Sequence, residues 1–114
     1  MQKPYTAVAD ATGTAVATIS DVPSGLMWVI PQFSIETVNF RVGSTCAVRR
    51  NGRLITQSSL GSGDTAFGPP SIALNSGDVL MFTWGGLVSG DEAVATLFCA
   101  EVPSNANPNP DVVV

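Results

Sequence analysis

Apolar and polar residues alternate along short stretches of the chain, and turn-forming residues interrupt these stretches about every eight to twelve positions. A period of two is typical of β-strands, because successive side chains of a strand point to opposite faces. Almost nowhere does the pattern follow the helical period. It predicts seven strands, and an eighth is weakly indicated near residues 5–9. The seven strands are expected at residues 15–21, 26–38, 45–50, 53–59, 71–74, 79–84 and 93–102.

The turns between these stretches support an antiparallel arrangement. Asn51 and Gly52 lie between two strand-like runs, and both residue types tolerate the positive φ that a two-residue type I′ hairpin requires. The spacing of strands and turns predicts a single antiparallel β-sandwich, either jelly-roll or immunoglobulin-like, of about 7–8 strands.

Alternation within two of the strands predicts which side chains form the core. In residues 79–84, one face carries Leu80, Phe82 and Trp84. The long strand at residues 26–38 is apolar on both faces in its first half. One of its faces carries Val29, Phe33 and Ile35, and the opposite face carries Trp28 and Ile30. Pro31 interrupts this strand and predicts a bulge or an edge position there.

The length of 114 residues and the mass of 11.8 kDa are enough for one domain. We expect an extended N-terminal arm at residues 1–11, the sandwich at 12–102, and an extended tail at 103–114. The tail is rich in proline and asparagine and ends in Val112, Val113 and Val114. These β-branched residues favour an arm that adds a strand to a neighbouring subunit; the alternative is a frayed chain end.

Charge and composition argue against an enzyme. Only 12% of the residues are charged, the net charge is −4, and there is no histidine. The chain therefore cannot form Ser-His-Asp or Cys-His nucleophile systems, or any metal site that uses imidazole. The spacing of Asp91 and Glu92 with Glu36 or Glu101 does not support a glycosidase pair. We expect no catalytic residue, no cofactor, no metal ion and no nucleic-acid partner.

The two cysteines and the apolar runs indicate the compartment. Residues 1–11 lack the apolar run of a secretory signal, and no stretch is long enough to span a membrane. We expect a protein made in a cytosol, not secreted by a signal peptide, with Cys46 and Cys99 reduced. One Cys46–Cys99 bridge is the alternative.

Ser-Gly-Asp occurs three times, at residues 62–64, 76–78 and 89–91. β-Turns that precede strands account for this recurrence. A shared calcium site is the alternative, but the chain has no calcium-binding loop of the EF-hand pattern.

Four of the five basic residues lie within thirteen positions of the sequence. Arg49, Arg50 and Arg53 bracket the predicted hairpin turn, and Arg41 precedes them. Together they predict a cationic tip that binds a carboxylate-rich protein surface, because arginine makes paired hydrogen bonds to carboxylates. A phosphate or an acidic glycan would fit the same chemistry. The alternative is a solubilising hairpin tip.

The aromatic residues offer a second binding hypothesis. Trp28, Trp84 and Tyr5 are expected in the core, but exposed rings of this kind form platforms for sugars. Such a platform also needs neighbouring polar donors. The candidates for that role are Gln32, Asn39 and Gln57.

Several segments resemble small β-sandwich proteins from the virions of tailed bacteriophages. They are Val22-Pro23-Ser24-Gly25, Trp28-Val29, the run from Cys46 to Ile55, the run from Gly63 to Pro70, Ser76-Gly77-Asp78-Val79-Leu80 and Thr83-Trp84-Gly85-Gly86. The resemblance covers roughly residues 16–102 and consists of turn and strand patterns. It implies a non-enzymatic structural role in the virion, as a capsid decoration (cementing) protein or a tail accessory protein. Such families have no catalytic residues to carry over.

The composition agrees with a protein that binds copies and neighbours, because depletion of charge is typical of interface cores. The expected partners are the chain itself, as a homo-oligomer with a trimer as the favoured form, and a major capsid or tail protein. The alternative function is a carbohydrate-binding or host-adhesion module of a phage tail or head fibre, with a glycan as ligand.

Overall fold

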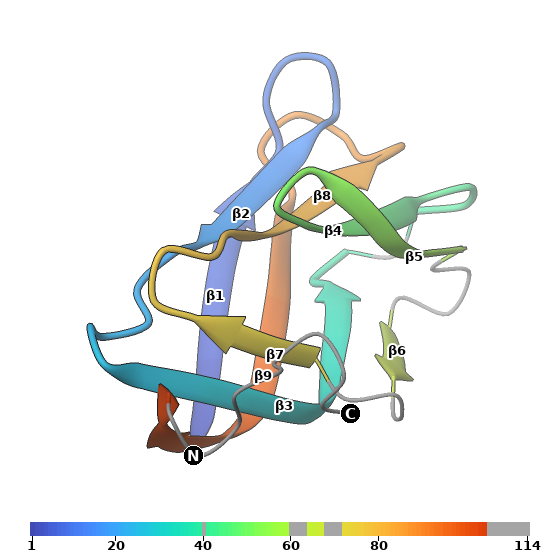
Figure 1. The fold of residues 1–114 in the computed structure, drawn as a ribbon. Helices are drawn as coiled ribbons and strands as arrows, with labels where there is room; N and C mark the ends of the chain where they lie inside the picture. The colour runs from blue at the N-terminus through green and yellow to red at the C-terminus, as the bar shows by residue number, and fades with distance from the viewer. Residues whose placement is uncertain (40, 60–63, 68–71, 105–114) are drawn as a thin grey trace.

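The chain folds into strands connected by turns, as the alternation predicts. The computed structural model describes residues 1–39, 41–59, 64–67 and 72–104. Nine strands occur in these residues (Figure 1). They are β1 (Gln2–Val8), β2 (Ala15–Ile19), β3 (Leu26–Thr37), β4 (Thr45–Arg50), β5 (Arg53–Ser59), β6 (Asp64–Phe67), β7 (Ile72–Asn75), β8 (Leu80–Gly85) and β9 (Glu92–Pro103).

The strands form two antiparallel sheets that pack face to face. Sheet A has the order β1-β9-β3-β6, with β7 also paired to β3, and sheet B has the order β2-β8-β4-β5. Without the short β7, each sheet has four strands, and successive strands alternate between the sheets except at the hairpin of β4 and β5, which is the order of a jelly roll (Figure 1). The predicted antiparallel sandwich is therefore confirmed, and its topology is that of a jelly roll.

The hairpin between β4 and β5 forms as predicted. Asn51 has a φ of 51° and Gly52 a φ of 82°, which are values that a type I′ turn requires. The bounds of both flanking strands agree with the prediction to the residue. The weakly indicated strand near residues 5–9 also exists, as part of β1.

The predicted N-terminal arm is wrong for most of its length. Gln2–Val8 pairs with β9 residue by residue, from Gln2 opposite Phe98 to Val8 opposite Glu92. The segment therefore supplies an edge strand of sheet A, because its backbone amides and carbonyls find partners along β9. Of the predicted tail, Pro103 and Ser104 are described and Pro103 ends β9; Val112, Val113 and Val114 lie outside the described residues.

The core lies between the two sheets and includes the predicted face of β8, where Leu80, Phe82 and Trp84 are fully buried. For β3 the predicted faces are wrong. Trp28 and Ile30 share the core with Phe33 and Ile35, and Val29 lies on the solvent face. The reason is a bulge between Val29 and Gln32, which shifts the register against β9 and exchanges the two faces at Pro31. The bulge itself was predicted.

Candidate functional site

The solvent face of sheet B is the first candidate surface, and we call it the sheet B face. Two rows of directly paired residues cross it. One row is Thr18, Met81, Arg49 and Leu54, and the other is Val16, Thr83, Ala47 and Gln57. Val16 is 47% exposed and Leu54 48% exposed. Arg49 is the one charged residue among these eight.

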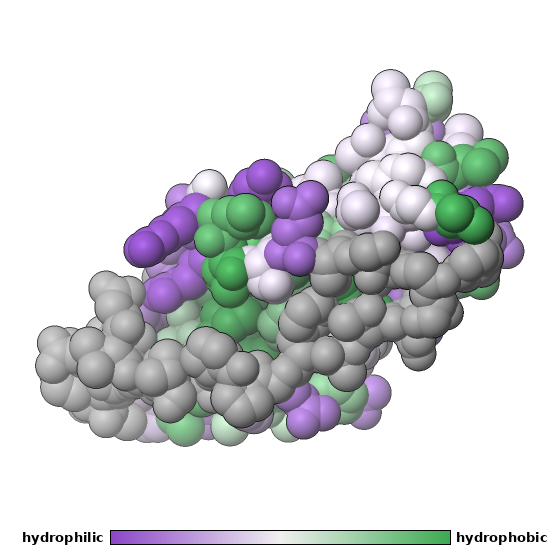
Figure 2. Space-filling model, turned by 90° about the vertical axis from the view of Figure 1, so that its right-hand side faces the viewer, coloured by the Kyte–Doolittle hydropathy of each residue, from purple (hydrophilic) through white to green (hydrophobic). Residues whose placement is uncertain are grey.

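On another side of the molecule the exposed apolar residues do not form one cluster. Figure 2 views the side that carries β5 and β6, where hydrophobic residues lie in separate groups between hydrophilic ones. Single exposed apolar residues are normal for a folded protein. The sheet B face differs from the side seen in Figure 2, because its paired rows place Val16, Leu54 and Met81 on one continuous strand surface.

The predicted cationic tip is only partly formed. Arg49 belongs to the sheet B face, whereas Arg50 and Arg53 pair with each other across the hairpin and lie on the opposite face of the strands. Arg50 is half-buried, and its Nη2 lies 3.4 Å from Oδ2 of Asp78. Arg53 is exposed. The tip therefore contributes Arg49 and Arg53, on different faces, as cations that can bind a partner.

Arg41 is wrongly grouped with this tip. Its Nε and Nη2 donate to the two carboxylate oxygens of Asp91 at 2.7 and 2.9 Å. Asn39 also donates to Asp91, at 3.2 Å, and these bonds hold the pKa of Asp91 far below its ordinary value. Arg41 and Asn39 therefore fix the loop between β8 and β9 and are occupied there.

Two of the three Ser-Gly-Asp sequences are turns with the same hydrogen bond. The Asp78 carboxylate accepts from the amide of Asn75, and the Asp91 carboxylate accepts from the amide of Val88, in each case three residues earlier. Each aspartate also contacts an arginine. The turn interpretation holds for both, and the described residues contain no group of three or more potential metal ligands. The third sequence lies mostly outside the described residues.

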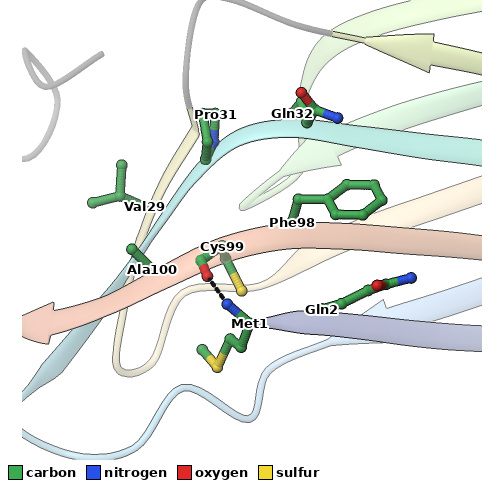
Figure 3. A pocket seen from close by; sticks show the side chains of 8 residues that line it. All are labelled: Met1, Gln2, Val29, Pro31, Gln32, Phe98, Cys99 and Ala100. Carbon is green, nitrogen blue, oxygen red and sulfur yellow. Dashed lines mark hydrogen bonds between the residues drawn. The ribbon is translucent and has the colours of Figure 1, made fainter.

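A groove on the solvent side of sheet A is the second candidate site, and we call it the Phe98 groove. It has a volume of about 610 Å³ and lies where β3 bulges away from β9 (Figure 3). Its lining residues are Met1, Gln2, Val29, Pro31, Gln32, Phe98, Cys99 and Ala100. Phe98 is half-buried and lies between Gln32 of β3 and Gln2 of β1.

The sequence contains a signal for this groove that the strand prediction did not use. In β9 the buried positions are Ala93, Ala95, Leu97 and Cys99. Phe98 lies between two of them, so its side chain points to the solvent face of the strand. An aromatic residue at a solvent-facing position of the alternation indicates a candidate binding surface rather than a core contact. Gln2 was not foreseen, because its strand was expected to be an arm, while Gln32 was already a candidate donor.

The tryptophan platform for sugars is wrong. Trp28 and Trp84 are 1% and 0% exposed, respectively. The Nε1–H of Trp28 donates to Oε2 of Glu101 at 2.9 Å, and the Lys3 ammonium lies 4.7 Å from the centre of the ring. These two charged residues cover the Trp28 end of the core. Tyr5 is half-buried, packs against the core and donates to the Asp21 carboxylate.

Both cysteines are buried free thiols, so the alternative of a disulfide is wrong. Burial raises the pKa of the Cys46 thiol to about 12, and burial also raises the pKa of Cys99. Cys46 contributes to the core. Neither thiol has the depressed pKa of a reactive cysteine.

We expect the stability of the protein to fall as the pH rises from about 9 towards 12. The folded-state pKa of Cys46 is about 12, whereas an unfolded thiol ionises near 9.0, so the unfolded chain alone loses the proton in this window. The loss is about 1.4 kcal/mol per pH unit within it. Urea unfolding at pH 8 and pH 10.5 measures this effect. Cys46→Ala should show a smaller decrease, and equal decreases in the two proteins would contradict the assignment to Cys46.

The described residues contain no helix long and apolar enough to cross a membrane. No family model matches the chain, and no curated protein matches it.

Several solved structures are similar to the chain at low sequence identity. One, described as "CBM4 structure and function", is 12% identical, with 90% of this chain and 94% of that chain covered and a TM-score of 0.42. The crystal structure of FLHE is 8% identical, with 90% and 97% covered and a TM-score of 0.44. The crystal structure of GITRL from bushbaby is 11% identical, with 85% and 96% covered and a TM-score of 0.39. These likenesses concern the fold alone.

Proposed function

We propose that the protein is a non-enzymatic structural component that binds a repeating protein lattice, as a capsid decoration protein or tail accessory protein of a virion does. The observation that carries this proposal is the sheet B face. It combines exposed aliphatic residues with one arginine, on a sheet whose opposite side contributes Leu80, Phe82 and Trp84 to the core. The resemblance to small virion sandwiches supports the choice of a virion lattice.

The composition of the sheet B face supports protein binding. Interface cores are depleted of charge and enriched in methionine and arginine, and both of these residue types occur here in Met81 and Arg49. The small side chains of Ala47 and Thr83 lie in the neighbouring row, so another flat surface can approach closely. A modest contact of this kind becomes strong when many copies bind to one lattice.

Arg49 indicates the chemistry of the partner. A guanidinium forms two hydrogen bonds to a carboxylate, and these are strong when the pair is desolvated. The partner surface is therefore expected to present an aspartate or glutamate surrounded by apolar residues. The chain as a whole is acidic, with nine carboxylate side chains and five basic ones, so Arg49 also favours an acidic partner surface over contacts between like-charged surfaces.

Location in a purified particle is the direct test of this function. Antibodies against the whole chain should label purified virions from the producing cells at regularly repeated positions in electron micrographs. Particles that lack the protein, from cells in which its gene is deleted, are the control for the labelling. Absence of the protein from purified virions would overturn the proposal.

Charge reversal tests the sheet B face itself. Arg49→Glu should weaken binding to particles that lack the protein by about tenfold or more, or about 1.4 kcal/mol, because a carboxylate then faces a carboxylate. Cosedimentation at several salt concentrations measures the affinity, which should also become less dependent on salt.

Arg53→Glu is the matched control for this prediction. It changes the net charge equally, but Arg53 lies on the other face of the hairpin. Equal loss of binding in the two variants would mean that the total charge matters rather than the sheet B face.

A further inference from the structure

The Phe98 groove has a symmetric arrangement that neither the core nor the sheet B face explains. Gln2 of β1 and Gln32 of β3 are both directly opposite Phe98 in register, one on each side of β9. Directly paired residues on one face of an antiparallel sheet have Cβ atoms about 4.5–5.5 Å apart. One aromatic ring is therefore flanked by two amides on the solvent side of sheet A, as Figure 3 shows.

The bulge in β3 provides the depth of the groove. Pro31 leaves the ladder between Val29 and Gln32, and the small Ala100 lies opposite Val29 on β9. The volume of about 610 Å³ is within the range of about 300–1,000 Å³ that is usual for small-molecule sites. The hollow therefore lies next to the ring and is large enough for a ligand beyond one water molecule.

The side chains of the groove indicate a neutral ligand. None of its eight lining residues has a charged side chain, so the side chains provide no counter-charge for a phosphate, sulfate or carboxylate. The α-ammonium of Met1 is the charged group among these residues, and it donates to the carbonyl of Cys99 at 2.6 Å. An amide group both donates and accepts hydrogen bonds, as a sugar hydroxyl does. Phe98 adds an apolar ring face, against which the C–H face of a pyranose can pack. A ligand with one apolar face and hydroxyls around its edge matches all three side chains.

We propose that the Phe98 groove binds a neutral saccharide, with one pyranose ring packed on Phe98 and its hydroxyls bonded to Gln2 and Gln32. The next row along the solvent face of sheet A contains Thr96 and Ser34, paired with each other, so hydroxyl groups continue along the strands. A chain of several sugar residues fits this direction better than a single ring.

This site is on the opposite side of the sandwich from the sheet B face. A protein attached through sheet B therefore leaves the Phe98 groove directed away from its lattice, where it can meet a glycan. The saccharide site does not depend on the lattice proposal. Each of the two can fail without the other, because the two tests use different variants and different ligands.

Nuclear magnetic resonance titration of the whole ¹⁵N-labelled chain tests the site. The probes are cellotetraose, maltotetraose and chitotetraose, which are neutral, and a trivaline peptide as an apolar probe without hydroxyls. We expect at least one tetrasaccharide to shift the side-chain amide signals of Gln2 and Gln32 and the backbone signals around Phe98. With a single ring in the site, the affinity should be weak, with a Kd of about 1 mM.

Phe98→Ala and Val94→Ala form a matched pair that tests the contribution of the ring to saccharide binding. Phe98→Ala should weaken saccharide binding at least tenfold, while Val94→Ala, on the same face of β9 two rows away, should bind normally. Both positions are half-buried on the solvent side of the strand, and the dispersion of the amide spectrum reports whether each variant remains folded. Gln32→Ala should weaken binding and leave the shifts at Phe98 in place.

The proposal is overturned if no tetrasaccharide shifts these signals at about ten times the expected Kd. It is equally overturned if the trivaline peptide alone shifts them, since the groove would then be an apolar peptide site. Unchanged saccharide affinity in a folded Phe98→Ala variant would place the saccharide elsewhere on the molecule.

Discussion

Replacing Phe82 by alanine is expected to lower the free energy of unfolding by about 3–5 kcal/mol. Phe82 is completely buried between the sheets. Its ring centre lies 5.6 Å from that of Phe33 in an edge-to-face contact and 6.0 Å from that of Trp84 in a stacked contact. Alanine leaves a cavity between the two sheets and removes both contacts. Because a domain of this size has a total stability of about 5–15 kcal/mol, the loss is a large part of it.

Urea unfolding, followed by tryptophan fluorescence and circular dichroism, measures this loss. Thr83→Ala is the control, since Thr83 neighbours Phe82 but faces solvent on sheet B. It should change the stability by less than about 1 kcal/mol. Similar losses in the two variants would contradict the position of the core between the sheets.

Local patterns were sufficient to predict elements whose structure depends on neighbouring residues. The hairpin of β4 and β5 follows from Asn51 and Gly52, because the conformation of the turn determines the pairing beside it, Arg50 with Arg53 and Arg49 with Leu54. Beyond Arg49 the register shifts, and Val48 pairs with Thr56. The core face of β8 follows from the alternation of Leu80, Phe82 and Trp84, because this strand has no bulge.

Features that are determined by pairing with distant strands, rather than by the alternation within one strand, were not predicted. β6 has only four residues and exists as a strand through its pairing with Phe33–Glu36 of β3, at the opposite edge from β9. The faces of β3 depend on where its register shifts against β9, and alternation alone gives no position for this one-residue shift. The salt bridge between Arg50 and Asp78 likewise joins residues 28 positions apart.

The candidate sites also divide into a part that local sequence predicts and a part that depends on distant strand pairing. Arg49 was found from its charge, but its separation from Arg50 and Arg53 follows from strand geometry at the hairpin. The Phe98 groove needs three strands at once, with Gln2, Phe98 and Gln32 far apart in sequence. A site whose residues are brought together by the pairing of several strands can be predicted from sequence only after the order of the strands is known.

Gly13→Ala is expected to be among the most destabilising small substitutions in the chain, with a loss of about 3–4 kcal/mol. Gly13 lies in the turn between β1 and β2 with a φ of +79°, a conformation that costs an L-residue about 1–2 kcal/mol. A Cβ at this position would also collide with the backbone carbonyl of Leu87 in the loop after β8. That backbone cannot move freely, since the amide of Leu87 donates to the carbonyl of Gly13 at 3.1 Å. The substitution therefore combines an unfavourable φ with a steric clash that pushes the β1–β2 turn away from the β8–β9 loop.

Gly25→Ala separates these two causes, because Gly25 has nearly the same φ of +80° and nothing within 4 Å of an added Cβ. It should cost only the conformational part, about 1–2 kcal/mol. Urea midpoints of the two variants, measured under one set of conditions, give the difference directly. Since the difference arises from contact between the β1–β2 turn and the β8–β9 loop, a Leu87→Ala variant, which keeps the carbonyl, should not relieve it. Equal losses for Gly13→Ala and Gly25→Ala would mean that the two loops separate at little cost, and that this end of the sandwich is held by the strands alone.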